Sequence, residues 1–427
     1  MDAVKSKNQK VNKFSYIIDR TVDVLLLFLL CVLTSHNVSV EGENYIYYLA
    51  FFSYIGVAAF RAIIKSYLNL FHFRIPIHTL WYGLFIILGL ASYLWAKYPD
   101  AAMDNISRLT QNLILSFFMI INVEKKEDFR RLQNIFILSV VYMSFKILFS
   151  VSPSELFSRH LGNYDITGHN VNFTAFYFAI VLILLFYRFY VEKTRIYFLL
   201  ILFLGFMLIL TSSRKALLMM IVGFFLIALF DKNTKHKLLK ILIGLLIFAV
   251  FVYLIFTNEK LYRAIGWKFD SMLSFLENNK GDKSLFERKF FREYAMELFY
   301  KNPFVGVGLN NFSQYLGNIF SRSTYSHNNW LEMLSCLGII GFITYYWFYL
   351  YCVLKSYTQL KKGYRSILPF MIIIITMFIF EYAQIVYYDT FIQLVISLCF
   401  IGISVGDRAL EMNANEGYSV TGGNEIE

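Results

Sequence analysis

The sequence predicts an all-α, polytopic membrane protein, and two features of its apolar residues carry this prediction. Apolar residues make up 58% of the 427-residue chain and charged residues 16%, whereas an average soluble domain is about 45–50% apolar and about 25% charged. The apolar residues also come in long blocks, and a block of about 20 such residues spans a bilayer as a helix. Because an open sheet could not satisfy its backbone there, helices are the expected spanning element.

About twelve apolar blocks are candidate transmembrane helices, nine within residues 21–256 and three within residues 327–406. The predicted spans are Thr21–Val40, Tyr45–Ile64, Ile77–Trp95, Arg108–Val123, Leu132–Ser150, Asn172–Tyr190, Ile196–Leu210, Lys215–Phe230, Ile241–Phe256, His327–Lys355, Ser366–Ala383 and Asp389–Gly406. The tenth block is too long for a simple span and contains Gly338 and Gly341, so we expect it to be tilted or broken. Residues 407–427 are polar and are predicted to form a disordered cytoplasmic tail.

The distribution of Lys and Arg predicts which side of the membrane each loop faces. With residues 1–20 as a cytoplasmic tail, the inside loops hold most of these cations, and the short outside loops hold only Lys97, Arg108, Arg159, Arg214 and Lys215. This distribution follows the positive-inside rule. The expected orientation therefore has both chain ends on the cytoplasmic side of the membrane. The net charge of +11 is then a property of cytoplasmic loops, and no nucleic acid is expected as a partner.

Residues 257–326 form the one long connection, a large extracytoplasmic loop predicted between the ninth and tenth helices. Ser284 and Glu287 have the spacing of a capping box. Apolar residues then recur at helical spacing until Pro303 and the glycines after it. We therefore expect an amphipathic helix at residues 285–301, resting on the membrane surface or on the bundle. Long loops are usually functional or disordered, and a capped helix argues against disorder.

Three polar places on the predicted outer side could take part in chemistry. Arg214 lies in a TSSR turn at a span edge, where it could also be a snorkelling residue. Arg288 and Arg292 share one helix face and suit an anion such as phosphate, although a basic face beside lipid headgroups would look the same. His327 lies where the chain re-enters the membrane, where the helix dipole favours a neutral imidazole; by itself it could also be an ordinary polar residue. No Cys or His spacing indicates a metal, and no cofactor is expected.

Five segments follow the order of motifs in a known family. They are LWAKYPDAA (94–102), GHNVNFTAF (168–176), TSSRKALL (211–218), RKFFREYAMELFYKNPFVGVGLNNF (288–312) and SHNNWLEMLSCLGIIGF (326–342). In these segments the chain resembles the O-antigen ligase and polysaccharide polymerase superfamily of bacterial envelopes, and the resemblance covers nearly all of residues 77–355. The last two segments are its specific part. Many relatives have Trp in place of Arg292, so Arg288 resembles the family's functional arginine.

The resemblance implies a metal-independent glycosyltransferase whose glycan donor is carried on undecaprenyl diphosphate at the outer face of the inner membrane. By position, Arg214 and Arg288 would be catalytic and bind the diphosphate, and His327 would activate the acceptor hydroxyl. Arg292 and Asn328 would be further substrate-binding residues. Elementary chemistry agrees, because fixed cations stabilise a leaving diphosphate and an attacking hydroxyl needs a general base. The alternative bases are the carboxylates of Asp270, Asp282 and Glu293.

The expected function is that of a polysaccharide polymerase, which joins lipid-linked repeat units of capsule, exopolysaccharide or O-antigen. The nearest alternative is an O-antigen ligase that transfers glycan to lipid A core. An alternative of another class is a lipid-linked oligosaccharide flippase, which needs polar residues along a central cavity. Mid-span charges are few here (Lys146 and Glu381), and this favours an enzyme. The expected partners are the undecaprenyl-diphosphate-linked oligosaccharide, membrane lipid and other polysaccharide-export proteins.

Overall fold

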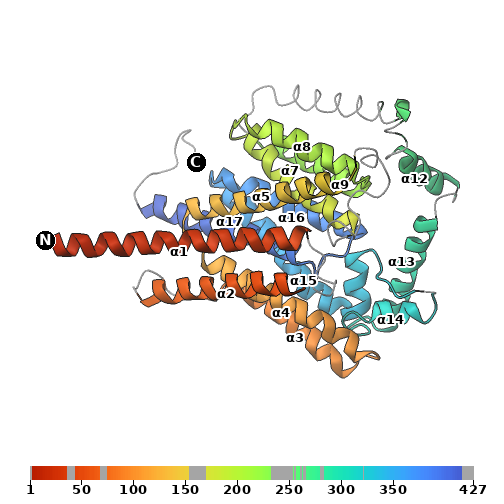
Figure 1. Ribbon diagram of the computed structural model, residues 1–427. Coiled ribbons are helices and arrows are strands. Elements are labelled where there is room, and N and C mark those ends of the chain that lie inside the picture. The colour runs from red at the N-terminus through yellow and green to blue at the C-terminus, as the bar shows by residue number, and fades with distance from the viewer. Residues whose placement is uncertain are drawn as a thin grey trace.

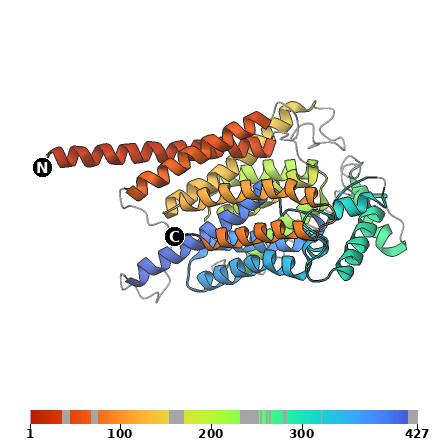
Figure 2. The ribbon, with the colours of Figure 1, turned by 90° about the horizontal axis from the view of Figure 1, so that it is seen from below.

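The described part of the protein is a bundle of helices. The computed structural model describes residues 2–35, 44–67, 75–152, 170–231, 253, 256–259, 262, 266–278, 283–320 and 322–415. Within these ranges there is no strand. The start of α1 (Asp2–Ser35) and the end of α17 (Thr390–Asn415) lie at one end of the bundle, and α12 (Trp267–Asn278), α13 (Lys283–Lys301) and α14 (Phe312–Gly317) lie at the other (Figures 1 and 2). We call these the terminus end and the loop end.

Helices occur at every predicted span except Ile241–Phe256, nearly all of which is outside the described residues. They are α1 (Asp2–Ser35), α2 (Asn44–Tyr67), α3 (Ile77–Ala91), α4 (Pro99–Ile121), α5 (Lys126–Ser150), α7 (Val171–Tyr190), α8 (Tyr197–Leu210), α9 (Arg214–Phe230), α15 (Asn329–Lys361), α16 (Leu368–Phe380) and α17 (Thr390–Asn415). By length and composition, seven helices among the described residues can cross a membrane. The predicted fold class, an all-α polytopic membrane protein, is confirmed.

The predicted disordered tail is wrong at its start, because α17 continues through residues 407–415. Packing explains the longer helix. Gln359 Nε2 donates to Asp407 Oδ1 (2.8 Å), Arg408 donates to the Val123 carbonyl (3.3 Å), and Leu410 packs against the apolar core. Composition alone did not show these contacts, which reach back to residues far earlier in the chain. The rest of the predicted tail, 416–427, lies outside the described residues.

The long tenth block is broken as expected, and the break occurs at Gly338. This residue has φ 63° and ψ −164° inside α15, a conformation in the left-handed half of the backbone map that favours glycine. A segment we call the strap, residues 303–311, lies in the break. The Ile339 N–H of α15 donates to the Pro303 carbonyl of the strap (2.9 Å). In the opposite direction, the Val307 N–H of the strap donates to the Ser335 carbonyl of α15 (2.9 Å). Backbone groups freed by the break are thereby satisfied.

The strap can lie this close only because two of the facing residues are glycines. A Cβ at Gly306 would overlap the backbone of Cys336, and one at Gly338 would overlap the backbone of Phe304. The strap also binds the connection between α3 and α4. The Leu309 N–H donates to Ser92 Oγ (3.0 Å), and Asn311 exchanges two hydrogen bonds with the backbone of Tyr98 (2.9 and 3.0 Å). Three motifs distant in sequence therefore meet at the loop end.

Helix α13 presents its apolar stripe to the bundle. Phe291, Ala295 and Leu298 are buried, and α13 packs on α15. The predicted capping box is wrong, because the chain is already helical at Lys283 and Ser284 lies inside the helix. Glu287 accepts a hydrogen bond from Arg322 instead (2.7 Å). A tertiary ion pair thus replaces the local cap that the spacing suggested.

Candidate active site at the loop end

The TSSR turn places Arg214 at the first residue of α9. Ser212 has a positive φ of 54°, and Ser213 Oγ donates to Asn172 Oδ1 at the start of α7 (3.2 Å). Lys215, the next residue, donates to the Ala383 carbonyl and to Gln384 Oε1 (3.2 Å). The charges of Arg214 and Arg288 both act on Lys215, so cations of α9 and α13 gather at the same end of the bundle.

His327 lies in the chain between the strap and α15, beside the cations of α13. Its ring lies 6.1 Å from that of Phe291 and 4.3 Å from that of Tyr325, measured between centroids. Burial, and to a lesser extent the nearby charges of Arg288, Lys215, Arg322 and Arg292, together lower the pKa of His327 to about 3. The imidazole is therefore neutral at pH 7 in this structure, as the sequence predicts. Arg288 and Lys215 are therefore both close to His327. Arg214 is close to Lys215, the next residue in the chain.

Backbone strain is concentrated near this site. Among the described non-glycine residues, the positive φ angles are those of Lys193, Ser212, Asn310 and His327, and the last three belong to the loop end. Such conformations cost on the order of 1–3 kcal/mol each and gather at functional sites. The surrounding contacts hold His327 in a backbone conformation that residues other than glycine seldom adopt.

Arg292 and Asn328 lie in different surroundings. The Arg292 guanidinium lies 5.7 Å from the ring centroid of Tyr382, in a groove that Met296 and Leu331 also line. Asn328 is fully buried and caps α15, because the Leu331 N–H donates to its Oδ1 (3.1 Å). Its Nδ2 is buried and has no hydrogen-bond partner within the described ranges. The Oδ1 atom of Asn328 thus has a structural role, and its Nδ2 atom is a donor that the described residues do not use.

The alternative bases predicted from the sequence are placed less well than His327. Asp270 accepts a hydrogen bond from the Tyr262 hydroxyl (2.7 Å), and Glu293 is exposed on α13. Asp282 lies outside the described residues. A carboxylate that sequence reasoning missed is better placed, namely Glu332 on the first turn of α15.

Glu332 lines a polar cavity of about 280 Å³ at the loop end. The cavity is also lined by Asn105 and Arg108 of α4, Asn310 of the strap, Ser313 of α14 and Tyr325. Glu332 is 2% exposed, and its Oε2 accepts a hydrogen bond from the Ser326 N–H (2.9 Å). Because Tyr325 also contacts His327, one aromatic ring separates the cavity from the imidazole. The only sequence signal was a Glu on an apolar helix, four residues before a buried Cys.

A second buried carboxyl group, that of Glu381, is structural. It follows α16 and accepts hydrogen bonds from the hydroxyls of Tyr346 (2.7 Å) and Tyr349 (2.6 Å) and from Asn329 Nδ2 (2.8 Å). Asn329 Oδ1 in turn accepts from the Val386 N–H (3.1 Å). Both carboxyl oxygens of Glu381 thus accept hydrogen bonds from a neighbouring helix. Glu332, in contrast, lines a cavity.

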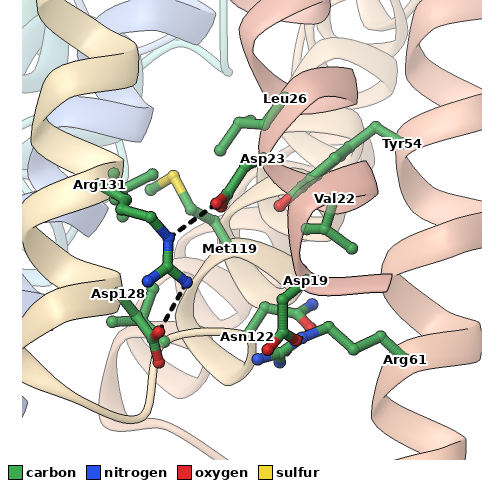
Figure 3. Close-up of a pocket in the computed structure, with 12 residues that line it drawn as sticks. Asp19, Val22, Asp23, Leu26, Tyr54, Arg61, Met119, Asn122, Asp128 and Arg131 are labelled. Carbon is green, nitrogen blue, oxygen red and sulfur yellow. Dashed lines mark hydrogen bonds and ion pairs between the residues drawn. The ribbon is translucent and has the colours of Figure 1, made fainter. Parts of the chain in front are cut away.

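The terminus end has its own polar cavity, of about 20 Å³, which has room for about one water molecule. Arg131 donates to Asp23 (2.8 Å) and to Asp128 (2.7 Å) there, as Figure 3 shows. Arg61 donates to Asp19 (2.5 Å) in the same cluster. Each of these cations is paired with an anion, so this cluster joins α1, α2, α4 and α5 and offers little space for a ligand.

The fold and the loop-end site together define a polytopic membrane protein with a cation-rich polar site at one end of its helical bundle. Residues 198–346 match the family model described as O-antigen ligase, and this stretch contains Arg214, Arg288 and His327. The match confirms the resemblance to the O-antigen ligase and polysaccharide polymerase superfamily. It supports a glycan-transferring membrane enzyme and does not distinguish a polymerase from a ligase. No curated protein matches the chain.

Proposed function

We propose that the protein is a polysaccharide polymerase that joins undecaprenyl-diphosphate-linked repeat units at the outer face of the bacterial cytoplasmic membrane. The observation that carries this proposal is the position of a neutral His327 beside Arg288 and Lys215, within the segment that matches the O-antigen ligase model. A neutral imidazole can accept a proton, and the cations can hold a diphosphate. The expected products are capsule, exopolysaccharide or O-antigen chains.

In the proposed reaction, a sugar hydroxyl of one repeat unit attacks the anomeric carbon of the glycan on a second lipid carrier. The new bond joins the hydroxyl oxygen to that carbon, and the bond from the carbon to the phosphate oxygen breaks. His327 takes the hydroxyl proton. The departing diphosphate keeps the electron pair, and Arg214 and Arg288 stabilise its growing charge without a metal ion. Arg292 and the Asn328 amide would help to hold the substrate.

The second candidate is an O-antigen ligase, which the description of the matching family favours. Purified protein in nanodiscs, supplied only with lipid-linked repeat units, separates the two. A polymerase lengthens the glycan without any other acceptor. Transfer that occurs only after lipid A core is added would identify a ligase. Transbilayer movement of intact units without transfer would identify a flippase and overturn the proposal.

The proposal also requires the loop end to face outward, and cysteine labelling in whole cells tests this orientation. A cysteine at Asn278 of α12 should react with an impermeant maleimide. One at Lys193, an exposed residue between α7 and α8, is the matched control and should not react. Labelling of Lys193 alone would place the loop end inside the cell and exclude an outer-face reaction.

A further inference from the structure

The cavity beside Tyr325 has a lining suited to a carbohydrate. Every residue that lines it carries a polar side-chain atom, and two of them, Tyr325 and Tyr388, also present aromatic rings. Ligand pockets for drug-sized molecules measure about 300–1,000 Å³. At about 280 Å³, this cavity has the size for one sugar ring and is too small for a longer oligosaccharide.

The polar groups of the cavity are held in place by hydrogen bonds to other parts of the protein and to one another. Asn105 Nδ2 donates to the Tyr387 hydroxyl (2.9 Å), and Asn310, in its positive-φ conformation, donates from Nδ2 to the Ala101 carbonyl (2.8 Å). Ser313 Oγ donates to the Asn310 carbonyl (3.2 Å). A lining fixed in this way loses little side-chain entropy when a ligand binds.

Glu332 supplies the buried carboxyl group of this lining. Glu332 is 2% exposed, and the cation nearest to it in the cavity lining, Arg108, is not within ion-pair distance of it among the described residues. Burial of a carboxylate without a cation is costly unless hydrogen-bond donors surround it. The Ser326 N–H supplies one donor (2.9 Å). Adjacent hydroxyls of a sugar ring could supply two more, because a carboxylate accepts at both oxygens.

We propose that this cavity binds the acceptor sugar ring, and that Glu332 selects it by accepting hydrogen bonds from two of its hydroxyls. This inference rests on the proposed function, because it assigns the other substrate of the same site. Tyr325 lines the cavity and its ring lies 4.3 Å from that of His327, so a sugar ring bound there is separated from the imidazole only by the Tyr325 side chain. In the proposed reaction, Arg288 binds the other substrate, at the diphosphate of the donor.

The test is sugar binding to the full chain in nanodiscs, with a panel of methyl glycosides of common neutral hexoses and N-acetylhexosamines as probes. Binding is measured by saturation-transfer NMR and competition. Wild-type protein should bind at least one member, and Glu332→Gln should weaken that binding by about 10- to 100-fold, as expected for a lost hydrogen bond to a charged group. Asn105→Leu should weaken it similarly. Glu381→Gln makes the same change in a buried carboxyl group outside the cavity and should leave the affinity within about threefold.

Two results would overturn the inference: no probe binds the wild-type protein, or Glu332→Gln binds as well as wild type. An equal loss of glycoside affinity in Glu332→Gln and Glu381→Gln would also overturn it. Replacing any buried carboxyl group would then weaken binding, whether or not the group lines the cavity. Polymer formation is measured in parallel, where Glu332→Gln should raise KM more than it lowers kcat. Wild-type polymer formation without glycoside binding would defeat this inference alone, whereas glycoside binding without any glycan transfer would defeat the proposed function.

Discussion

The two ends of the bundle both collect charged residues, but they use them differently. At the terminus end, Arg61 and Arg131 each donate to aspartates of neighbouring helices, around space for about one water molecule. At the loop end, the charges that act on His327 are all positive, and a cavity more than ten times larger lies one ring away. Paired charges join helices and leave nothing for a ligand. Cations gathered around a neutral base are suited to an anionic substrate.

The largest expected effect is at His327. His327→Ala should reduce polymer formation by about 100- to 10,000-fold, the usual effect of losing a general base. His327→Gln keeps a hydrogen-bonding group but cannot accept a proton near neutral pH, so it should fail as well. Glycan length on gels, protein amount in the membrane and lipid-linked single units are measured together. In these variants single units should accumulate on the outer leaflet. Units stranded on the cytoplasmic leaflet would instead indicate a flippase.

The next largest effect separates charge from geometry at the arginines. Arg288→Lys and Arg214→Lys keep the charge but lose the planar fork that binds phosphate at two points. Each should lower the rate of transfer by about 100- to 1,000-fold. Arg322→Lys is the matched control, because the Arg322 side chain is more than half exposed and its ion pair with Glu287 should tolerate Lys within about fivefold. Arg292→Ala should also be mild, since a cation–π contact contributes about 0.5–1 kcal/mol. Equal losses of transfer rate in Arg288→Lys and Arg322→Lys would mean that Arg288 has no special role in binding the diphosphate.

The sequence predicted most of the fold because its signals are local. Each spanning helix is a continuous apolar block, and the break of α15 could be expected from Gly338 in a block too long for one span. The wrong predictions concern places where contacts with distant residues override local pattern. Glu287 pairs with Arg322 instead of capping α13, and Gln359 supports α17 beyond Gly406. Such partners cannot be read from spacing.

The candidate site was predicted in part for the same reason. Arg214, Arg288 and His327 could be named because they lie in motifs, and the structure places all three at the loop end. The cavity could not be predicted, because its walls come from α4, the strap, α14 and α15. Asn105 and Asn310, for example, are more than 200 positions apart, and both line it. A lone Glu332 in an apolar helix gives no local sign that it faces this space.

A smaller effect, on pH dependence, tests whether the loop-end cations act on His327. With its pKa at about 3 in the free enzyme, His327 is deprotonated across pH 5–8, so kcat/KM should not fall in that range through this residue. A bound diphosphate would offset the charges of Arg288, Lys215, Arg322 and Arg292 and raise the pKa of His327. Because the protonated ring cannot act as a base, kcat should then fall as pH drops, with a midpoint above that of kcat/KM. A kcat/KM midpoint near 6.5 would contradict the buried, cation-surrounded site.

The smallest effect on activity is expected at the terminus end, where Arg61 is 3% exposed and donates to Asp19 (2.5 Å) and Asn122 (2.7 Å). Arg61→Met keeps the length of the side chain and removes its charge. It should lower the free energy of unfolding by about 1.5–3 kcal/mol, as hydrogen bonds to charged groups typically contribute, and leave kcat/KM per folded molecule unchanged. Thermal unfolding in detergent and the transfer assay give the two readouts.

The matched control for Arg61→Met is Arg130→Gln, also at the terminus end, whose partner Glu192 is about one-quarter exposed. Since pairs near the surface contribute about 0–1 kcal/mol, this variant should melt close to wild type. If the two ends differ as argued, Arg61→Met lowers the free energy of unfolding and leaves kcat/KM unchanged. If Arg61→Met abolished transfer in protein that melts like wild type, the paired charges of the terminus end would take part in the reaction, and pairing would no longer separate a structural cluster from a functional one.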